Sequence, residues 1–171
     1  MWSNWAGDQT CLPAVHLRPA GTAEVADAVA RAAEAGRVVR VAGAGHSFSD
    51  AVLTDGTLLS LDRMGRIVDI DGDLVRVQAG ANLHTLSREL HARGLALPNL
   101  GDIDVQALAG ATATATHGTG ARKFNVSAQV EAVELVDGSG EVRGIDAGDE
   151  LRAARVHLGP LCVLTEMTLR W

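Results

Sequence analysis

Apolar residues recur at helical spacing in the segment between Thr22 and Gly36. The stripe consists of Val25, Ala28, Val29, Ala32 and Ala33. Glu24 lies in the first turn of this predicted helix, and Gly36 supplies a stop signal. Apolar and β-branched runs at residues 15–19 and 37–42 flank the helix and predict strands. The resulting strand–helix–strand unit is the usual source of parallel strand pairing.

The middle of the chain alternates between short apolar runs and turn residues. The runs predict strands at residues 58–61, 67–70 and 74–77. Asp71-Gly72-Asp73 separates the last two runs and is a good hairpin signal. Leucines at helical spacing then follow an Asn82 cap and precede a stop at Gly94, which predicts a second helix.

The last third is strand-rich. Residues 130–136 alternate in polarity, residues 137–140 form a turn, and residues 141–143 return. A short helix near residues 150–155 precedes a final strand at residues 162–169. The pattern predicts an α+β domain with an αβ N-terminal lobe and a mostly antiparallel β C-terminal lobe with flanking helices. We expect one domain, residues 1–171, with a first lobe over about 1–77 and a second over about 78–171.

Charge and composition exclude several classes of partner. The 171 residues carry a formal net charge of −6 and contain no basic cluster, which argues against binding to nucleic acid or anionic membranes. No apolar run approaches the roughly 18–20 residues that cross a bilayer. The first five residues do not resemble a secretory signal. We therefore expect a cytoplasmic protein without nucleic-acid or membrane partners.

Cysteine and glycine usage adds two expectations. Cys11 and Cys162 lie far apart and in no C-x-x-C pair, so we expect two small buried side chains, with a single disulfide as the alternative. The 19 glycines are the compositional anomaly. Glycine allows positive φ and close backbone approach, so clusters of it indicate ligand loops or tight turns.

The first glycine-bearing segment, Val41-Ala42-Gly43-Ala44-Gly45-His46-Ser47-Phe48, directly follows a predicted strand. Such loops bind phosphate by pointing successive backbone N–H groups inward. Phe48 stands where a Rossmann loop has its third glycine, and the Gly-Lys-Ser/Thr of a Walker loop is absent. The segment is thus a phosphate-loop candidate, with an ordinary glycine turn as the alternative. His46 would lie close to any ligand that this loop binds, with a place on the loop surface or a hydrogen-bonded spectator role as the alternative.

The second segment runs from Gly110 to Gly120 and alternates small residues with threonines before Thr116-His117-Gly118-Thr119-Gly120. A core strand would normally carry larger apolar side chains, because filling volume stabilises a core. Small side chains and hydroxyls suit backbone that lies against a flat polar ligand. A half-buried strand of small residues remains the alternative.

Other titratable residues form no recognisable metal or nucleophile pattern. His84 and His91 are seven apart on a predicted helix, whereas helical metal pairs prefer three or four, and no carboxylate stands at a matching spacing. No Gly-x-Ser-x-Gly elbow occurs. Packing, solvation or capping is the expectation for His16, His157, Asp102 and Asp104. We expect no metal site.

In this order, the segments resemble the FAD-binding, PCMH-type domain of the vanillyl-alcohol-oxidase superfamily. The nearest branch is similar to the sugar-lactone and alditol oxidases of the gulonolactone, arabinonolactone and xylitol oxidase types. The resemblance rests on Asn4-Trp5-Ala6-Gly7, Arg18-Pro19, Gly43 to Phe48, Gly94 to Asn99, Gly101-Asp102-Ile103-Asp104, Leu108 to Gly110, Thr116 to Gly120, Ala153 to Val156, and Val163-Leu164-Thr165.

The resemblance implies a two-lobed fold with FAD between the lobes, in an enzyme that oxidises a CH–OH group of a sugar lactone or polyol. It implies that the loop holding His46 wraps the pyrophosphate, that His46 is joined covalently to the flavin, and that backbone near Leu164 meets the adenine. The implied cofactor-binding residues are Val41, Ala42, Gly43, Ala44, Gly45, His46, Ser47, Asp102, Ala107, Gly110, Thr114, Ala115, Thr116, His117 and Leu164.

Two departures from the family pattern set further expectations. Cys162 stands where the family has glycine, so the approach of adenine there is in question. The chain also ends at Trp171, where family enzymes continue into a cap domain that holds substrate. We therefore expect weak or no turnover by this chain alone, and self-association or a separate cap over the flavin face. A flavin-binding module without turnover is the second hypothesis, and a non-flavin dinucleotide-binding or structural protein is the third.

Overall fold

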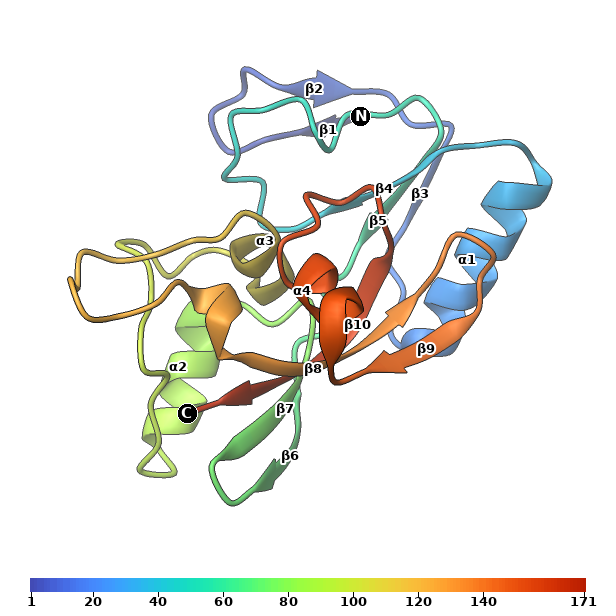
Figure 1. Cartoon of the computed structure of the whole chain (residues 1–171). Coiled ribbons are helices and arrows are strands. Elements are labelled where there is room, and N and C mark those ends of the chain that lie inside the picture. The colour runs from blue at the N-terminus through green and yellow to red at the C-terminus, as the bar shows by residue number, and fades with distance from the viewer.

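A three-stranded parallel sheet forms the first part of the protein (Figure 1). The computed structural model describes all 171 residues. The strands are β3 (Val15–Leu17), β4 (Val39–Ala42) and β5 (Thr57–Ser60), in the order β3-β5-β4. Helix α1 (Thr22–Glu34) connects β3 to β4, as predicted. The two strands that α1 connects are not neighbours, however, because β5 lies between them and pairs in parallel with both.

A five-stranded sheet, antiparallel throughout, forms the second part. Its strands, in spatial order, are β6 (Ile67–Asp71), β7 (Leu74–Gln78), β10 (Val163–Arg170), β8 (Val130–Val136) and β9 (Val142–Ile145). The β6–β7 turn has Gly72 at φ 56°, the left-handed conformation that the hairpin signal predicted. Because β6 and β7 belong to this sheet, the two sheets divide between β5 and β6, earlier than the lobe boundary expected near residue 77.

Four helical segments cover the second part. They are α2 (Leu83–His91), α3 (Leu108–Ala113), the 3-10 helix η1 (Val126–Gln129) and α4 (Gly148–Arg155). The predicted cap of α2 is present: the Asn82 side chain accepts a hydrogen bond from the backbone N–H of Thr85. Gly94, at φ 75°, follows the end of this helix.

Helix α3 corrects one sequence interpretation. The alternative of a half-buried strand from Gly110 onward is wrong, because residues 108–113 are helical. The N–H groups of Leu108 and Ala109 donate to the carbonyls of Ala81 and Ala79. These bonds satisfy amides at the start of the helix, which would otherwise lack partners. The helix is therefore fixed by contacts to a distant segment.

A hairpin that the sequence did not predict lies at the N-terminus. It pairs β1 (Trp2–Ser3) with β2 (Thr10–Cys11), beside the loop that follows β4 (Figure 1).

One hydrophobic core joins the two parts. Its 26 buried residues include members of α1, of both sheets and of α2, α3 and α4. The Thr22 hydroxyl at the start of α1 donates to Glu134 on β8 at 2.7 Å, which adds a polar link between the parts. The α+β class, with a parallel first part and an antiparallel second part, is as predicted. None of the helices is both long enough and apolar enough to cross a bilayer.

Candidate functional site

The two glycine-bearing segments lie against each other. The Gly43 loop begins where β4 ends, which is the edge of a parallel sheet where ligands commonly bind. A Cβ placed on Gly43 would lie 3.4 Å from the Ala107 Cβ and 3.9 Å from the Gly110 Cα. The fold thus joins a loop and a short helix that are more than sixty residues apart in sequence. Only small groups separate their backbones.

His46 is half-buried in this loop, after Gly45 at φ 71°. Its imidazole stacks on the indole of Trp5, with ring centroids 5.4 Å apart and planes inclined by 23°. The backbone N–H of Trp5 also donates to the Gly45 carbonyl at 2.8 Å. Sequence reasoning did not assign Trp5 to the site. The spacing between residues 5 and 46 carries no signal, because a tertiary contact brings them together.

The turn after α3 uses its hydroxyl groups internally. The Thr114 hydroxyl donates to the Gly110 carbonyl at 2.9 Å, and the Thr116 oxygen accepts from Gln106 Nε2 at 3.2 Å. Ala115 has φ 53°, a left-handed conformation that costs energy for a residue with a Cβ. His117 is exposed, and its Nδ1 lies 3.0 Å from the Gly118 carbonyl oxygen. The turn therefore offers mainly backbone groups and one exposed imidazole to a ligand.

Glycines in the second segment also serve packing within the chain. A Cβ on Gly118 would lie 2.6 Å from the Leu100 carbonyl oxygen, and one on Gly101 would lie 2.7 Å from the Thr116 Cγ2. The 99–101 turn and the 116–118 turn therefore touch closely. Asp102, exposed, follows this contact. The structure thus places the predicted residues Asp102, Thr116 and His117 in one neighbourhood.

Asp104 connects the segment that carries Asp102 to helix α2. Its Oδ2 lies 2.6 Å from Nδ1 of His84, and its carbonyl accepts the backbone N–H of His84 at 2.8 Å. These contacts tie the 102–106 segment to the first turn of α2.

A third segment, residues 157–164, reaches the same region. The backbone N–H of Leu158 donates to the Ala113 carbonyl at the end of α3. Leu158 and Gly159 both have positive φ, at 54° and 98°. A cavity of about 210 Å³ lies between β4 and this segment, and its lining includes Val39, Val41, Val136, Cys162 and Val163. Leu164 is only 3 % exposed, with its side chain in the core, so it can present only backbone to a ligand.

Burial controls the titration of two side chains in this third segment. It raises the pKa of the Cys162 thiol to about 11, and it holds the pKa of His157 below its ordinary value. His157 Nδ1 accepts the backbone N–H of Gly159 at 3.0 Å, and its buried Nε2 has no partner within the chain. Cys11 and Cys162 are both free thiols, so the disulfide alternative is wrong. Both side chains are partly rather than fully buried, so the prediction that they are buried is confirmed only in part.

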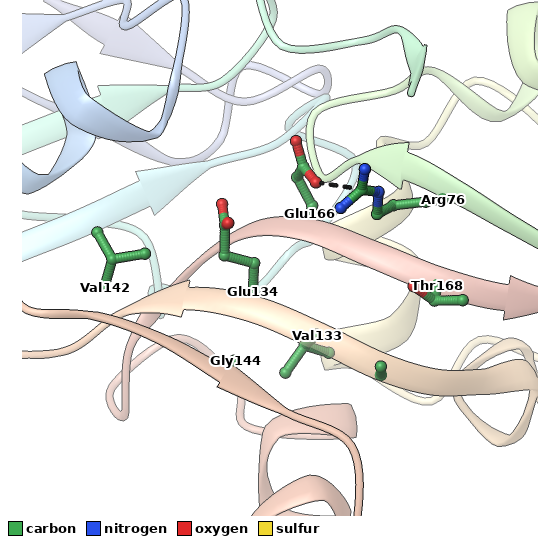
Figure 2. Close-up of a pocket in the computed structure, with 8 residues that line it drawn as sticks. Arg76, Val133, Glu134, Val142, Gly144, Glu166 and Thr168 are labelled. Carbon is green, nitrogen blue, oxygen red and sulfur yellow. Dashed lines mark ion pairs between the residues drawn. The ribbon is translucent and has the colours of Figure 1, made fainter. Parts of the chain in front are cut away.

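A second cavity, of about 240 Å³, lies on the five-stranded sheet, and none of the predicted site residues is among the residues that line it (Figure 2). Glu134 and Glu166 rise from neighbouring strands on the same side of it, and Glu166 pairs with Arg76 at 3.6 Å. Glu134 Oε1 accepts the hydroxyls of Thr22 and Thr165. These polar groups are thus engaged within the fold. No three His, Cys, Asp or Glu side chains lie close enough together to hold a metal ion.

Comparison with known proteins gives consistent matches. A sequence model described as FAD binding domain matches residues 13–146. The chain is 46 % identical over 172 residues to L-gulono-1,4-lactone dehydrogenase of Mycobacterium tuberculosis. The aligned region covers 99 % of this chain and 40 % of that protein. It is 35 % identical over 174 residues to L-gulonolactone oxidase of Mus musculus, with the same two coverages. The chain thus spans about 40 % of the length of these relatives.

Solved structures agree on the fold. A solvent-stable cholesterol oxidase superposes with a TM-score of 0.86 at 25 % identity, over 99 % of this chain and 36 % of that one. An alkyldihydroxyacetonephosphate synthase superposes with a TM-score of 0.81 at 19 % identity, over 91 % of this chain and 33 % of that one.

Proposed function

The chain belongs to the family of FAD binding domains, and on that premise we propose that it holds the FAD of an oxidoreductase acting on a CH–OH group of a sugar lactone or alditol. One observation carries the proposal: Gly43 lies against Ala107 and Gly110, and a Cβ on Gly43 would have only the Ala107 Cβ and the Gly110 Cα within 4 Å. A dinucleotide needs such close access to main-chain amides, because its pyrophosphate is bound largely by N–H groups.

The described segments fit the parts of FAD. The Val41–Ser47 loop would hold the pyrophosphate at the end of β4. The segment that includes Asp102, Ala107, Gly110 and Thr114 to His117 would line the flavin side. The cavity of about 210 Å³ between β4 and residues 159–163 is lined by nine hydrophobic residues out of fifteen, with Arg37, Arg40 and Asp137 adding charged groups. Such a mixed lining suits a flat heterocycle with polar edges, such as adenine. Backbone near Leu164 would meet the adenine there, with the Cys162 side chain forming part of the wall.

His46 would anchor the cofactor covalently. The bond would join an imidazole nitrogen of His46 to the 8α-methyl carbon of the flavin. It would release one proton from each partner together with one electron pair, which dioxygen would take up as hydrogen peroxide. Such a bond raises the redox potential of a flavin and prevents its loss. His46 is suited to this role because it is half-buried and held by a stacked neighbour.

The substrate class follows from the relatives. Bound FAD supplies the acceptor for the hydride that leaves the substrate carbon. The names of the relatives specify gulonolactone and arabinonolactone as substrates, so we assign a sugar lactone, or an alditol of similar chemistry, to the full-length protein. The chain's own residues would bind and orient the flavin.

A second function is a flavin-binding module without substrate turnover. The engagement of Thr114 and Thr116 within the chain favours it, since these hydroxyls have little left to offer a sugar. An enzyme loses much of its acceleration without groups that orient the substrate. Flavin reduction by L-gulono-1,4-lactone distinguishes the two functions: the bound flavin bleaches anaerobically in an enzyme and stays oxidised in a module.

The test of the cofactor assignment is an absorbance spectrum of the purified protein before and after acid precipitation. We expect flavin bands that remain with the pellet for the wild type and pass to the supernatant for His46→Ala. Flavin that leaves the wild-type pellet would reduce His46 to a contact residue. A protein that takes up no added FAD would refute the whole proposal.

A further inference from the structure

The N-terminal hairpin contacts three consecutive residues of the loop that carries His46. The Trp5 N–H donates to the Gly45 carbonyl, the Trp5 indole stacks on His46, and Asn4 Nδ2 donates to the Ser47 carbonyl at 3.0 Å. The Trp2 ring also approaches: its Cζ2 would lie 3.4 Å from a Cβ on Gly45. The hairpin therefore fixes the loop on both sides of the histidine.

Asn4 gives this contact its rigidity. The residue is only 6 % exposed, and all of its side-chain polar atoms are paired. Nδ2 donates to Asp8 Oδ1 and to the Ser47 carbonyl, while Oδ1 accepts the backbone N–H of Gln9. A buried amide with its hydrogen bonds satisfied holds its surroundings in one arrangement, because breaking any bond leaves a buried polar group unpaired.

Trp5 contributes little to the core. Its side chain is 69 % exposed, and the aromatic ring that it contacts is that of His46. An exposed indole of this kind adds little to the stability of the fold. It does restrict the neighbouring imidazole, because stacked rings resist rotation out of the common plane.

We infer that Trp5 is a positioning residue for His46: its indole sets the plane of the imidazole so that a ring nitrogen meets the flavin methyl carbon when FAD is bound. The inference rests on the proposed covalent role of His46. It concerns the rate at which the bond forms, and it assigns Trp5 no part in the affinity for FAD. The bond itself is the one described above, with dioxygen as the oxidant.

The experiment follows covalent attachment with time. Protein prepared without flavin is mixed with excess FAD, samples are precipitated with acid, and flavin in the pellet is measured. Trp5→Ala should attach flavin about threefold to tenfold more slowly than wild type, the factor expected from the loss of one stacked aromatic pair. Trp5→Phe keeps a stacked ring and should attach flavin at close to the wild-type rate. Leu12→Ala removes another exposed apolar side chain just after β2 and is the matched control, with no expected change.

Two further measurements separate positioning from folding and binding. The dissociation constant for FAD, taken from early time points before attachment, should stay within about twofold of wild type in Trp5→Ala, since an exposed ring is removed and the backbone contact to Gly45 remains. The melting temperature should also be unchanged. If Trp5→Ala attaches flavin more slowly and also binds FAD more weakly by a similar factor, or melts at a lower temperature, its role is merely structural and the inference is overturned.

The outcomes distinguish this inference from the proposed function. Wild type that attaches flavin, with Trp5→Ala equally fast, overturns the positioning role alone. Wild type that binds FAD but releases all of it on precipitation overturns the covalent role of His46, and the positioning role with it. That second result appears in the wild-type sample, before any variant is compared.

Discussion

Gly43 and Gly118 belong to the two glycine-bearing segments, and the structure predicts opposite consequences for replacing them with alanine. A Cβ on Gly118 would come within 2.6 Å of the Leu100 carbonyl oxygen, a backbone atom. The Leu100 turn cannot move freely, because the neighbouring Asn99 donates to the Phe124 carbonyl at 2.7 Å and accepts from Gln129 at 2.8 Å. Gly118→Ala must therefore strain backbone that is already fixed.

The magnitude follows from the cost of overpacking. Forcing an extra methyl group into a fixed site costs about 1–3 kcal/mol. For a protein of this length, each kcal/mol lowers the melting temperature by about 2–4 °C, so we expect a fall of about 2–12 °C for Gly118→Ala. A Cβ on Gly43 instead meets Ala107 at 3.4 Å, an ordinary contact, and the residue does not have positive φ. Gly43→Ala should leave the melting temperature within about 2 °C.

Ligand binding should show the reverse order. A methyl group on Gly43 occupies the space between the loop and α3, where the proposed pyrophosphate site needs bare backbone, so the affinity for FAD should fall about tenfold or more. Thermal melting and fluorescence titration with FAD, made on both variants, check the pair. If Gly43→Ala melts as early as Gly118→Ala and binds FAD like wild type, the assignment of Gly43 to ligand access is refuted.

Two further predictions concern the 157–162 segment. Burial holds the pKa of His157 below its ordinary value of 6.5, so the unfolded chain binds a proton there that the folded chain does not, and the free energy of unfolding should fall as the pH drops below about 6.5. Urea unfolding between pH 7.5 and 5.5 should show a smaller loss of this free energy for His157→Gln than for wild type. An equal loss in both proteins would contradict this prediction. Burial raises the pKa of the Cys162 thiol to about 11, so little reactive thiolate is present at pH 8. In a Cys11→Ser background, iodoacetamide at pH 8 should therefore label Cys162 slowly until urea unfolds the chain. Labelling of the folded protein at the rate of free cysteine would show that the Cys162 thiol is not buried in this way.

The sequence predicted elements whose signals are local. Helix α2 has a side-chain cap at Asn82 and a left-handed glycine at Gly94, and both lie within a few residues of the helix that they define. The hairpin turn at Gly72 is equally local. Such elements can be predicted because the residues that stabilise them are close in the sequence.

The elements that sequence reasoning missed depend on distant partners. Helix α3 consists of small residues without an apolar stripe, and the N–H groups of Leu108 and Ala109 are satisfied by carbonyls of residues 81 and 79. The β1–β2 hairpin has only two residues in each strand and rests against a loop about forty residues away. Propensity carries little information about either, because tertiary contacts decide them.

The candidate site was predicted in part for the same reason. The glycine loop and the Thr-His-Gly-Thr-Gly segment have recognisable compositions, so both were identified separately. Their contact through Gly43 and Ala107 depends on the whole fold. Trp5 lies in a segment that contributes to the family resemblance, but nothing in its own neighbourhood in the sequence indicates that it stacks on His46.

The order of the first sheet has a consequence for synthesis of the chain. Strands β3 and β4 never pair with each other, so neither gains a sheet partner until β5, at Thr57–Ser60, has left the ribosome. Helix α1 gains its packing partners later still, because it packs on β8 and β10, and β10 ends at Arg170. Contacts over such separations slow folding. The site around Gly43 therefore cannot assemble until nearly all of these residues have emerged, and FAD should not be captured before β10 has left the ribosome.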